Sequence, residues 1–297
     1  MIINKSTLHD LFVSFNLAFQ NGLGKAEKQY DKIAMIVPST GSETKYAWLG
    51  NFPAMREWLG DRIVGNFAAH SYTIVNKNFE STVTVSRDDV EDDKVGIYKP
   101  MFEMLGDEAA VHPDKLIFEI VRNGHELPCY DRLPFFSDAH PVIVDGKDAT
   151  ASNNLAPESK PGTPWYLFCT RRPMKPFIFQ KRRDYTLVRM DSPNDENVFM
   201  RNEFLYGVDG RVNVGFGLWQ MAVRSTHPLN AANYAAARAA MASLKSENGT
   251  PLGILPDTLL VPTALESDAL TLLNCELVNG SSNPWHGSAS LLVSPWL

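Results

Sequence analysis

The sequence predicts an α+β fold, in which strands come in runs and helices are segregated from them. Residues 164–225 are rich in aromatic and β-branched residues with short alternations, which is typical of several consecutive strands. Residues 86–123 and 229–245 instead carry apolar residues at helical spacing. A doubly wound sheet would alternate single strands with single helices, so the pattern does not favour that class.

Length and composition place the chain among globular proteins. Its 297 residues are 44% hydrophobic and 21% charged, enough for a large core in two domains or in one domain with long excursions. The 28 Lys and Arg against 34 Asp and Glu give a net charge of -6, which argues against a dedicated nucleic-acid binder. Three widely spaced cysteines imply neither a disulfide framework nor a zinc knuckle, and they favour a reducing compartment. Neither a signal-peptide pattern nor a membrane-length apolar run is present, so we expect an unexported protein without membrane contact.

The N-terminal segment predicts an amphipathic helix. Ser6 or Thr7 is the expected cap, and Gly22 and Gly24 are the expected stops. The apolar positions at helical spacing are Leu8, Leu11, Phe12, Phe15 and Phe19. A short strand is expected over residues 33–37, where a proline ends it.

Residues 39–71 follow no clean period, although they are rich in large apolar side chains broken by Gly and Pro. Such a segment docks either on the chain's own core or on another subunit. Residues 72–86 alternate around Asn76-Lys77-Asn78, which predicts a hairpin.

Ser86 is expected to cap a long helical stretch that runs to Asn123. The acidic residues 88–93 in its first turns fit the helix dipole, although they also offer ligands for a divalent cation. The residues expected to break or bend the stretch are Pro100, Gly106 and Pro113, the last by restarting a helix.

Residues 145–163 are polar and contain Pro and Gly, which predicts a surface loop or a boundary. The acidic run 191–196 is the expected turn between two strands. Towards the C-terminus, residues 259–261 predict a buried strand, Thr263 and Glu266 have capping-box spacing for a helix, and a terminal strand is expected over 290–293.

No catalytic template fits the sequence. The segment His125-Glu126-Leu127-Pro128-Cys129 resembles a damaged zinc motif, but Pro128 prevents the helix that would align two ligands. Neither a dinucleotide fingerprint, a phosphate loop nor a nucleophile elbow is complete. We therefore assign no catalytic, cofactor-binding or metal residues and expect no cofactor.

One concentration of positive charge is apparent, and it is a candidate contact patch. It faces either nucleic acid or an acidic neighbour, or it is a solvated strand edge whose charge blocks unwanted pairing. Its residues are Arg171, Arg172, Lys175, Lys181, Arg182 and Arg183.

Long aromatic-rich strings carry a family resemblance. KYAWLGNFPAMREWLGDR from Lys45, FESTVTVSRDDVEDD from Phe79, YGVDGRVNVGFGLWQ from Tyr206 and PLGILPDTLLVPTALE from Pro251 resemble the major head subunit of Mu-like phages and prophages, the gpT-type family. The match continues through the whole chain.

This resemblance implies the Hong Kong 97-type capsid fold. The corresponding parts are an N-terminal arm (1–44), an extended loop hairpin (45–85), a spine helix with the peripheral domain (86–144), and an axial domain with returning peripheral strands (145–297). Relatives with this fold often place the segment that starts at Trp165 near the C-terminus, so the domains here are expected to be discontinuous.

The resemblance also implies that the extended loop docks on an adjacent subunit. The expected apolar anchors are Trp48, Phe52, Met55 and Trp58, and the expected intersubunit charge pairs involve Arg56, Glu57, Asp61 and Arg62. No lysine lies between Lys45 and Lys77, so we expect a shell without isopeptide crosslinks from this loop.

The implied function is that of a non-enzymatic major capsid protein, which self-assembles into hexamers and pentamers of an icosahedral shell around double-stranded DNA bound without sequence specificity. Expected partners are a portal protein, a decoration protein and a scaffolding protein, the last separate because no scaffold domain precedes the first helix. The expected location is the virion, and the host cytoplasm during assembly. The alternatives are an encapsulin-like compartment that holds an enzyme cargo and a metal-dependent hydrolase.

Overall fold

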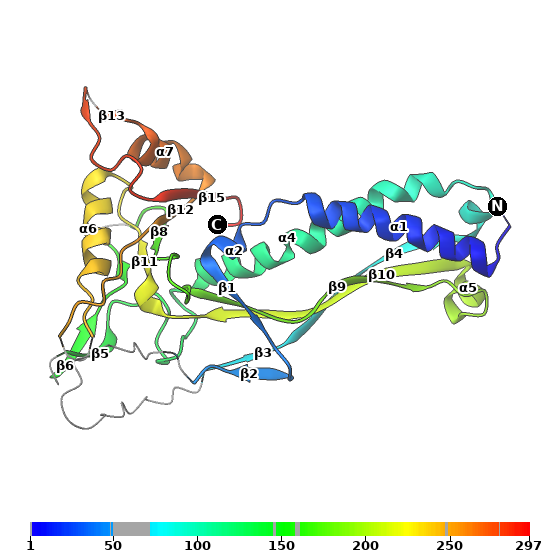
Figure 1. Ribbon diagram of the computed structural model, residues 1–297, viewed down its shortest axis with the longest axis horizontal. Helices are drawn as coiled ribbons and strands as arrows, with labels where there is room; N and C mark the ends of the chain where they lie inside the picture. Colours follow the sequence, from blue (N-terminus) through cyan, green and yellow to red (C-terminus); the bar gives the residue numbers. More distant parts are fainter. Residues whose placement is uncertain are drawn as a thin grey trace.

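The computed structural model describes residues 2–47, 49, 72–144, 147–157, 161–246, 249–278 and 280–297. These residues form an elongated molecule with two lobes (Figure 1). In the long lobe, helices α1 (Lys5–Lys25) and α4 (Lys99–Asn123) cover one face of a four-stranded sheet. In the short lobe, a five-stranded sheet lies beside helices α6 (Ala231–Ala242) and α7 (Glu266–Asn274).

The sheet of the long lobe has the order β1-β9-β10-β4. Its strands are β1 (Ala34–Pro38), β9 (Phe177–Met190), β10 (Glu203–Phe216) and β4 (Lys77–Ser86). Strand β1 runs parallel to β9, and the other neighbours are antiparallel. The register between β9 and β10 shifts on both sides of Arg211, which marks β-bulges in the middle of the two long strands.

The sheet of the short lobe has the order β15-β12-β8-β11-β7. Its strands are β15 (Ser290–Ser294), β12 (Thr258–Pro262), β8 (Trp165–Phe168), β11 (Ala222–Ser225) and β7 (Asn154–Leu155). The central strand β8 is buried at every position, which explains its run of four large apolar residues. The predicted strands over 259–261 and 290–293 are confirmed as parallel neighbours.

Aromatic packing fills the long lobe. The rings of Phe15 and Phe102 stack with centroids 4.2 Å apart, and both meet Tyr206 of the sheet edge-on. The C-terminal half of α4 and the inner ends of β9 and β10 instead share one hydrophobic cluster with the short lobe, through residues such as Ile117, Phe177 and Phe216. A continuous core therefore joins the two lobes.

Helix α1 corrects two predictions. Its cap is Asn4, whose Oδ1 accepts a hydrogen bond from the Thr7 amide at 2.9 Å, because Asn also caps well and stands earlier in the chain. The helix continues through Gly22 and Gly24, which do not stop it. A Cβ atom on Gly22 would lie 1.9 Å from the Glu103 carbonyl oxygen, so this glycine permits close packing on α4.

The predicted helical stretch over 86–123 is divided. It contains α3 (Arg87–Glu91), a 3-10 turn η1 (Val95–Tyr98) and α4. Asp93 adopts a left-handed conformation with φ 60°, which interrupts the helix. Pro100 lies in the first turn of α4, where its missing amide is tolerated, but Pro113 lies inside the helix and does not restart it.

The predicted hairpin around residues 76–78 is wrong. Strand β3 (Thr73–Val75) pairs with β2 (Glu43–Lys45), whereas β4 pairs with β10. Buried Asn76 connects them: its Nδ2 donates to Ser39 Oγ and to the Gly41 carbonyl, and its Oδ1 accepts from Gln180. These bonds let the chain change partner strands without turning back.

The polar stretch 145–163 is not simply a loop. It includes β6 (Lys147–Ala151), which pairs with β5 (His140–Val144), and it also includes β7.

The capping box predicted at Thr263 does not form, because a 3-10 turn precedes α7. The remaining short elements are α2 (Tyr30–Ile33), α5 (Glu196–Arg201), η2 (Trp219–Met221), η3 (Thr263–Leu265), β13 (Leu277–Val278) and β14 (Ser281–Ser282). None of the helices in the described part of the chain combines the length and hydropathy that crossing a membrane requires.

Candidate functional site

The eight residues predicted to anchor the extended loop lie outside the residues that the structure describes. They are Trp48, Phe52, Met55, Arg56, Glu57, Trp58, Asp61 and Arg62. Their role stays a prediction.

The predicted basic patch separates into two groups, of which the first surrounds the turn after β8. Arg172 donates from Nη2 to the carbonyl oxygens of Leu252 at 2.6 Å and Gly253 at 3.0 Å. Lys175 donates to the Asp31 carbonyl, whereas the Arg171 side chain is 84% exposed. Two of these three cations therefore tie segments of the chain together.

Buried Asp257 fixes the same turn. Its carboxylate accepts hydrogen bonds from the Thr170 amide at 2.9 Å, the Thr170 hydroxyl at 2.6 Å and the Arg171 amide at 3.1 Å. Because the carboxylate is buried, these bonds are needed to balance its desolvation. Asp257 thus holds the chain between β8 and β9, a role that its sequence context did not reveal.

The second basic group lies on β9. Lys181 pairs with Asp184 at 2.8 Å, and Arg183 pairs with Asp209. Arg182 and Arg183 line a surface hollow of about 360 Å³ together with Arg211 of β10. Arg211 is not part of the predicted patch, because strand pairing rather than proximity in the chain places it opposite Arg183.

The acidic residues at the start of α3 are engaged within the chain. Asp88 accepts a hydrogen bond from Asn202 at 2.9 Å, Asp89 accepts one from the Tyr98 hydroxyl at 2.6 Å, and Asp92 pairs with Lys94. These contacts favour the structural interpretation of the run over a cation site.

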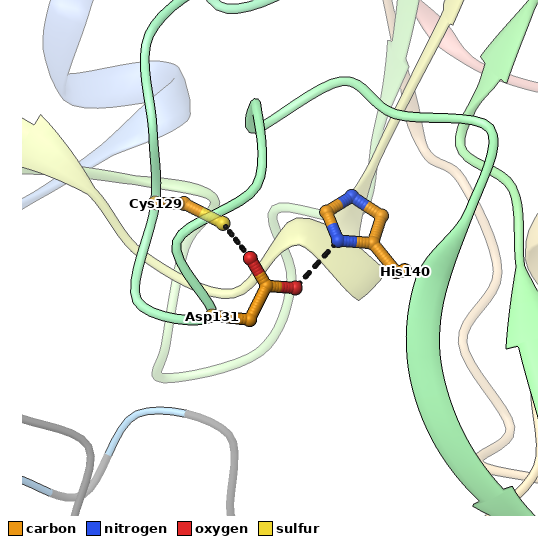
Figure 2. Close-up of side chains that lie close together, drawn as sticks. All are labelled: Cys129, Asp131 and His140. Atoms are coloured by element: carbon orange, nitrogen blue, oxygen red, sulfur yellow. Dashed lines mark hydrogen bonds and ion pairs between the residues drawn. The ribbon is translucent and has the colours of Figure 1, made fainter. Parts of the chain in front are cut away.

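Cys129, Asp131 and His140 form a largely buried cluster at the start of β5, and Figure 2 shows the two contacts of Asp131. Its Oδ2 lies 2.6 Å from His140 Nδ1, and its Oδ1 accepts from Cys129 Sγ at 3.1 Å. The imidazole stacks on Trp219 at 4.1 Å, and its Nε2 lies 3.3 Å from the Phe135 carbonyl oxygen. Both ring nitrogens therefore face acceptors.

This cluster has the geometry of hydrogen bonds. An N···O separation of 2.6 Å is a hydrogen-bond length, whereas two ligands on one tetrahedral zinc ion lie about 3.3 Å apart. Burial raises the pKa of the Cys129 thiol, and the neighbouring Asp131 carboxylate raises it further, so the thiol is a poor nucleophile at neutral pH. The cluster joins the segment after α4 to β5, and we assign it to folding.

Large apolar side chains are exposed at the outer end of the long lobe. On α5, Phe199 is 85% exposed and Met200 is 67% exposed. Asn197 holds this short helix in place by donating to the carbonyl oxygens of Met190 and Glu203. A fixed helix that presents two bulky apolar groups to solvent is typical of a protein–protein contact.

The fold itself identifies the class of protein. The chain in the procapsid of bacteriophage JBD30 matches this fold with a TM-score of 0.89 and 42% identity, over 99% of this chain and 100% of that chain. The chain in the JBD30 capsid decorated with minor capsid protein trimers matches with a TM-score of 0.77 and 30% identity, over 94% of each. The molecule is therefore a phage capsid subunit with the predicted Hong Kong 97-type α+β fold.

Sequence comparisons narrow this class. The family model of the Mu-like prophage major head subunit gpT matches residues 8–297. The major capsid protein of Escherichia phage Mu is 43% identical over 305 residues, which cover the whole of both chains. The chain belongs to the Mu-like gpT family, and its function is that of a major capsid protein. The family, fold and function predicted from the sequence are thereby confirmed, and the encapsulin-like alternative finds no support.

Proposed function

We propose that this capsid protein assembles, without enzymatic activity, into hexamers and pentamers that close an icosahedral shell around double-stranded DNA. The full-length likeness to a subunit of a phage procapsid carries the proposal. The exposed side chains of Phe199 and Met200 on α5 support the proposal, because large apolar side chains exposed together on a subunit mark a surface that binds another protein. Many modest contacts suffice for a closed shell, since each subunit binds several neighbours at once.

We assign the two lobes to the expected peripheral and axial domains. The long lobe, with α4 as the spine helix, is the proposed peripheral domain, and the short lobe is the proposed axial domain. Both β9 and β10 lie in the long lobe although they follow β8 in the chain, which supports the expected discontinuity.

The extended loop is the proposed strap between neighbouring subunits. Trp58→Ala is expected to leave a folded subunit that assembles poorly, because buried aromatic anchors dominate interface energy. Normal particle yield from this variant would exclude Trp58 as an anchor. The absence of lysine between Lys45 and Lys77 supports a shell that this loop does not crosslink, so mature particles should run as single subunits on denaturing gels.

Further partners belong to the same proposal. A separate scaffolding protein, a portal protein and DNA bound without sequence specificity complete the particle in the virion, after assembly in the host cytoplasm. A decoration protein is included because the JBD30 relative carries minor capsid protein trimers. The net charge of -6 suits a container that does not trap the DNA it receives.

Electron microscopy combined with sedimentation tests this function. The chain is expressed alone and then together with a candidate scaffolding protein. We expect closed shells, or rings that convert into shells when scaffold is added. A monomer or dimer under both conditions would overturn the proposal.

A further inference from the structure

Three arginines converge on one hollow of the long lobe. Arg182 and Arg183 of β9 and Arg211 of β10 line a volume of about 360 Å³. Strand pairing sets Arg211 directly opposite Arg183, and the register is irregular on both sides of Arg211. Bulges of this kind re-aim side chains, and they are over-represented beside functional sites.

The charges in this hollow are not balanced within the subunit. Like charges directly opposite each other across two strands repel. Asp209 pairs with Arg183, and Arg182 donates one bond to the Ser39 carbonyl at 3.3 Å. The Arg211 side chain forms no hydrogen bond or ion pair with the other residues that the structure describes, and its Nε is buried without an acceptor. A buried N–H group without a partner is destabilising, and three guanidinium groups outnumber the one carboxylate paired with them, so the hollow favours binding of an anion.

The residues around the hollow favour binding of a single anionic group over binding of a nucleic-acid backbone. A guanidinium fork matches the two oxygens of a carboxylate or a phosphate equally well. A DNA backbone, however, is held by several cations in succession. Here the neighbouring Lys181 is already paired with Asp184, and Glu80 of β4 lies opposite Asp209, so these neighbours add no free positive charge to the hollow.

We propose that Arg182, Arg183 and Arg211 receive a carboxylate side chain of a neighbouring copy of this chain. The inference rests on the proposed self-assembly and adds the chemistry of one contact to it. The proposed site keeps only Arg182 and Arg183 of the six residues in the predicted basic patch, and it adds Arg211.

The first experiment measures the lowest subunit concentration at which shells form. For Arg211→Gln we expect this concentration to rise by roughly tenfold or more, because removing one partner of a desolvated charge pair weakens binding at least that much. Arg132→Gln is the matched control, since Arg132 is exposed and distant in the chain from the hollow. Thermal unfolding of both unassembled variants shows that the subunit itself is intact.

The second experiment identifies the bound group directly. Arg211→Lys keeps the charge and supplies an amine that a carbodiimide couples to any carboxylate in contact with it. Shells are assembled from subunits carrying two different isotope labels, and the coupled peptides are identified by mass spectrometry. We expect a bond from position 211 to an Asp or Glu of a differently labelled copy. A bond only to Asp209 of the same chain, or none, would overturn the inference.

The outcomes separate this inference from the proposed function. If the unaltered chain forms no shells, self-assembly itself fails. If Arg211→Gln forms shells at the unaltered concentration, only the carboxylate site fails. The site is equally overturned if that variant builds normal shells that retain less DNA, because the arginines would then serve phosphate.

Discussion

Gly22 of α1 and Gly106 of α4 let two helix backbones touch. A Cβ atom on Gly22 would lie 1.9 Å from the Glu103 carbonyl oxygen, and one on Gly106 would lie 2.0 Å from that of Phe19. Neither contact is possible for a residue with a side chain, because the obstructing atoms belong to the backbone. The two glycines therefore set the separation of the helices that cover the long lobe.

Gly106→Ala is expected to lower the free energy of unfolding by about 2–3 kcal/mol, because the added methyl group forces the two helices apart. Gly24→Ala is the matched control in α1, since a Cβ there meets nothing within 4 Å. That control should gain about 0.5–1 kcal/mol from helix propensity. Urea denaturation of the unassembled subunit measures both changes. Equal stability of the two variants would contradict the close-packing interpretation.

Asp257→Ala should destabilise the subunit by about 3 kcal/mol, because several buried donors at Thr170 and Arg171 lose their acceptor. Asp257→Asn keeps one carboxamide oxygen and should lose less. Exposed Asp138 provides the control, and Asp138→Ala should stay within about 0.5 kcal/mol of the unaltered chain. The measurement is again the free energy of unfolding in urea. A loss of similar size in the control would remove any special role for Asp257.

The Asp131–His140 contact predicts a dependence on acidic pH. Burial raises the pKa of Asp131, but hydrogen bonds from His140 and Cys129 outweigh this effect, so that its pKa lies below the usual value of 3.8. Its contribution to stability is therefore present above about pH 4, and it disappears as the pH falls through the lower pKa of the folded state.

Asp131→Asn tests this dependence by unfolding curves between pH 3 and 7. At neutral pH the variant should be about 1–3 kcal/mol less stable, because His140 loses a charged partner. The difference from the unaltered chain should shrink as the pH falls below about 4. A constant difference across the whole range would show that the ionised carboxylate is not what stabilises this cluster.

Phe199→Ser separates assembly from folding. Because Phe199 is exposed, we expect the unfolding temperature of the subunit to change little, while the yield of shells falls several-fold. Its neighbour Val198 is 4% exposed and packs in the core of the long lobe, so Val198→Ser should lower the unfolding temperature first. Sedimentation and thermal unfolding distinguish the two effects. Unchanged shell yield for Phe199→Ser would remove α5 from the assembly surfaces.

Short sequence patterns correctly predicted the helices and strands whose formation depends mainly on neighbouring residues in the chain. Helix α6 and strand β12 occur where apolar periodicity and flanking prolines place them, since each buries one consistent set of side chains. The predicted turn in the acidic run 191–196 is likewise confirmed between β9 and β10. The arrangement of these elements in the whole fold was predicted only by the resemblance to the gpT-type family. The periodicity of apolar residues does not indicate how the elements are arranged.

Tertiary partners decided the features that sequence reasoning missed. Gly22 suggests a helix stop until α4 is known to lie against it, and Asn76 suggests a turn until Ser39 and Gln180 are known to bond to it. Arg211 has no basic neighbours on its own strand, so only its pairing with β9 reveals the arginine site. The spacing of residues along the chain does not predict these contacts, because the partners are far apart in the sequence.

The parallel pairing of β12 with β15 also covers a sheet edge that an incomplete chain exposes. Strand β12 lies between β8 and β15, so one of its edges stays open on the ribosome until residues 290–294 have been made. Unpaired strand edges are sites of premature association during synthesis. Pairing with residues 290–294 therefore closes an edge of β12 through which incomplete chains would otherwise associate.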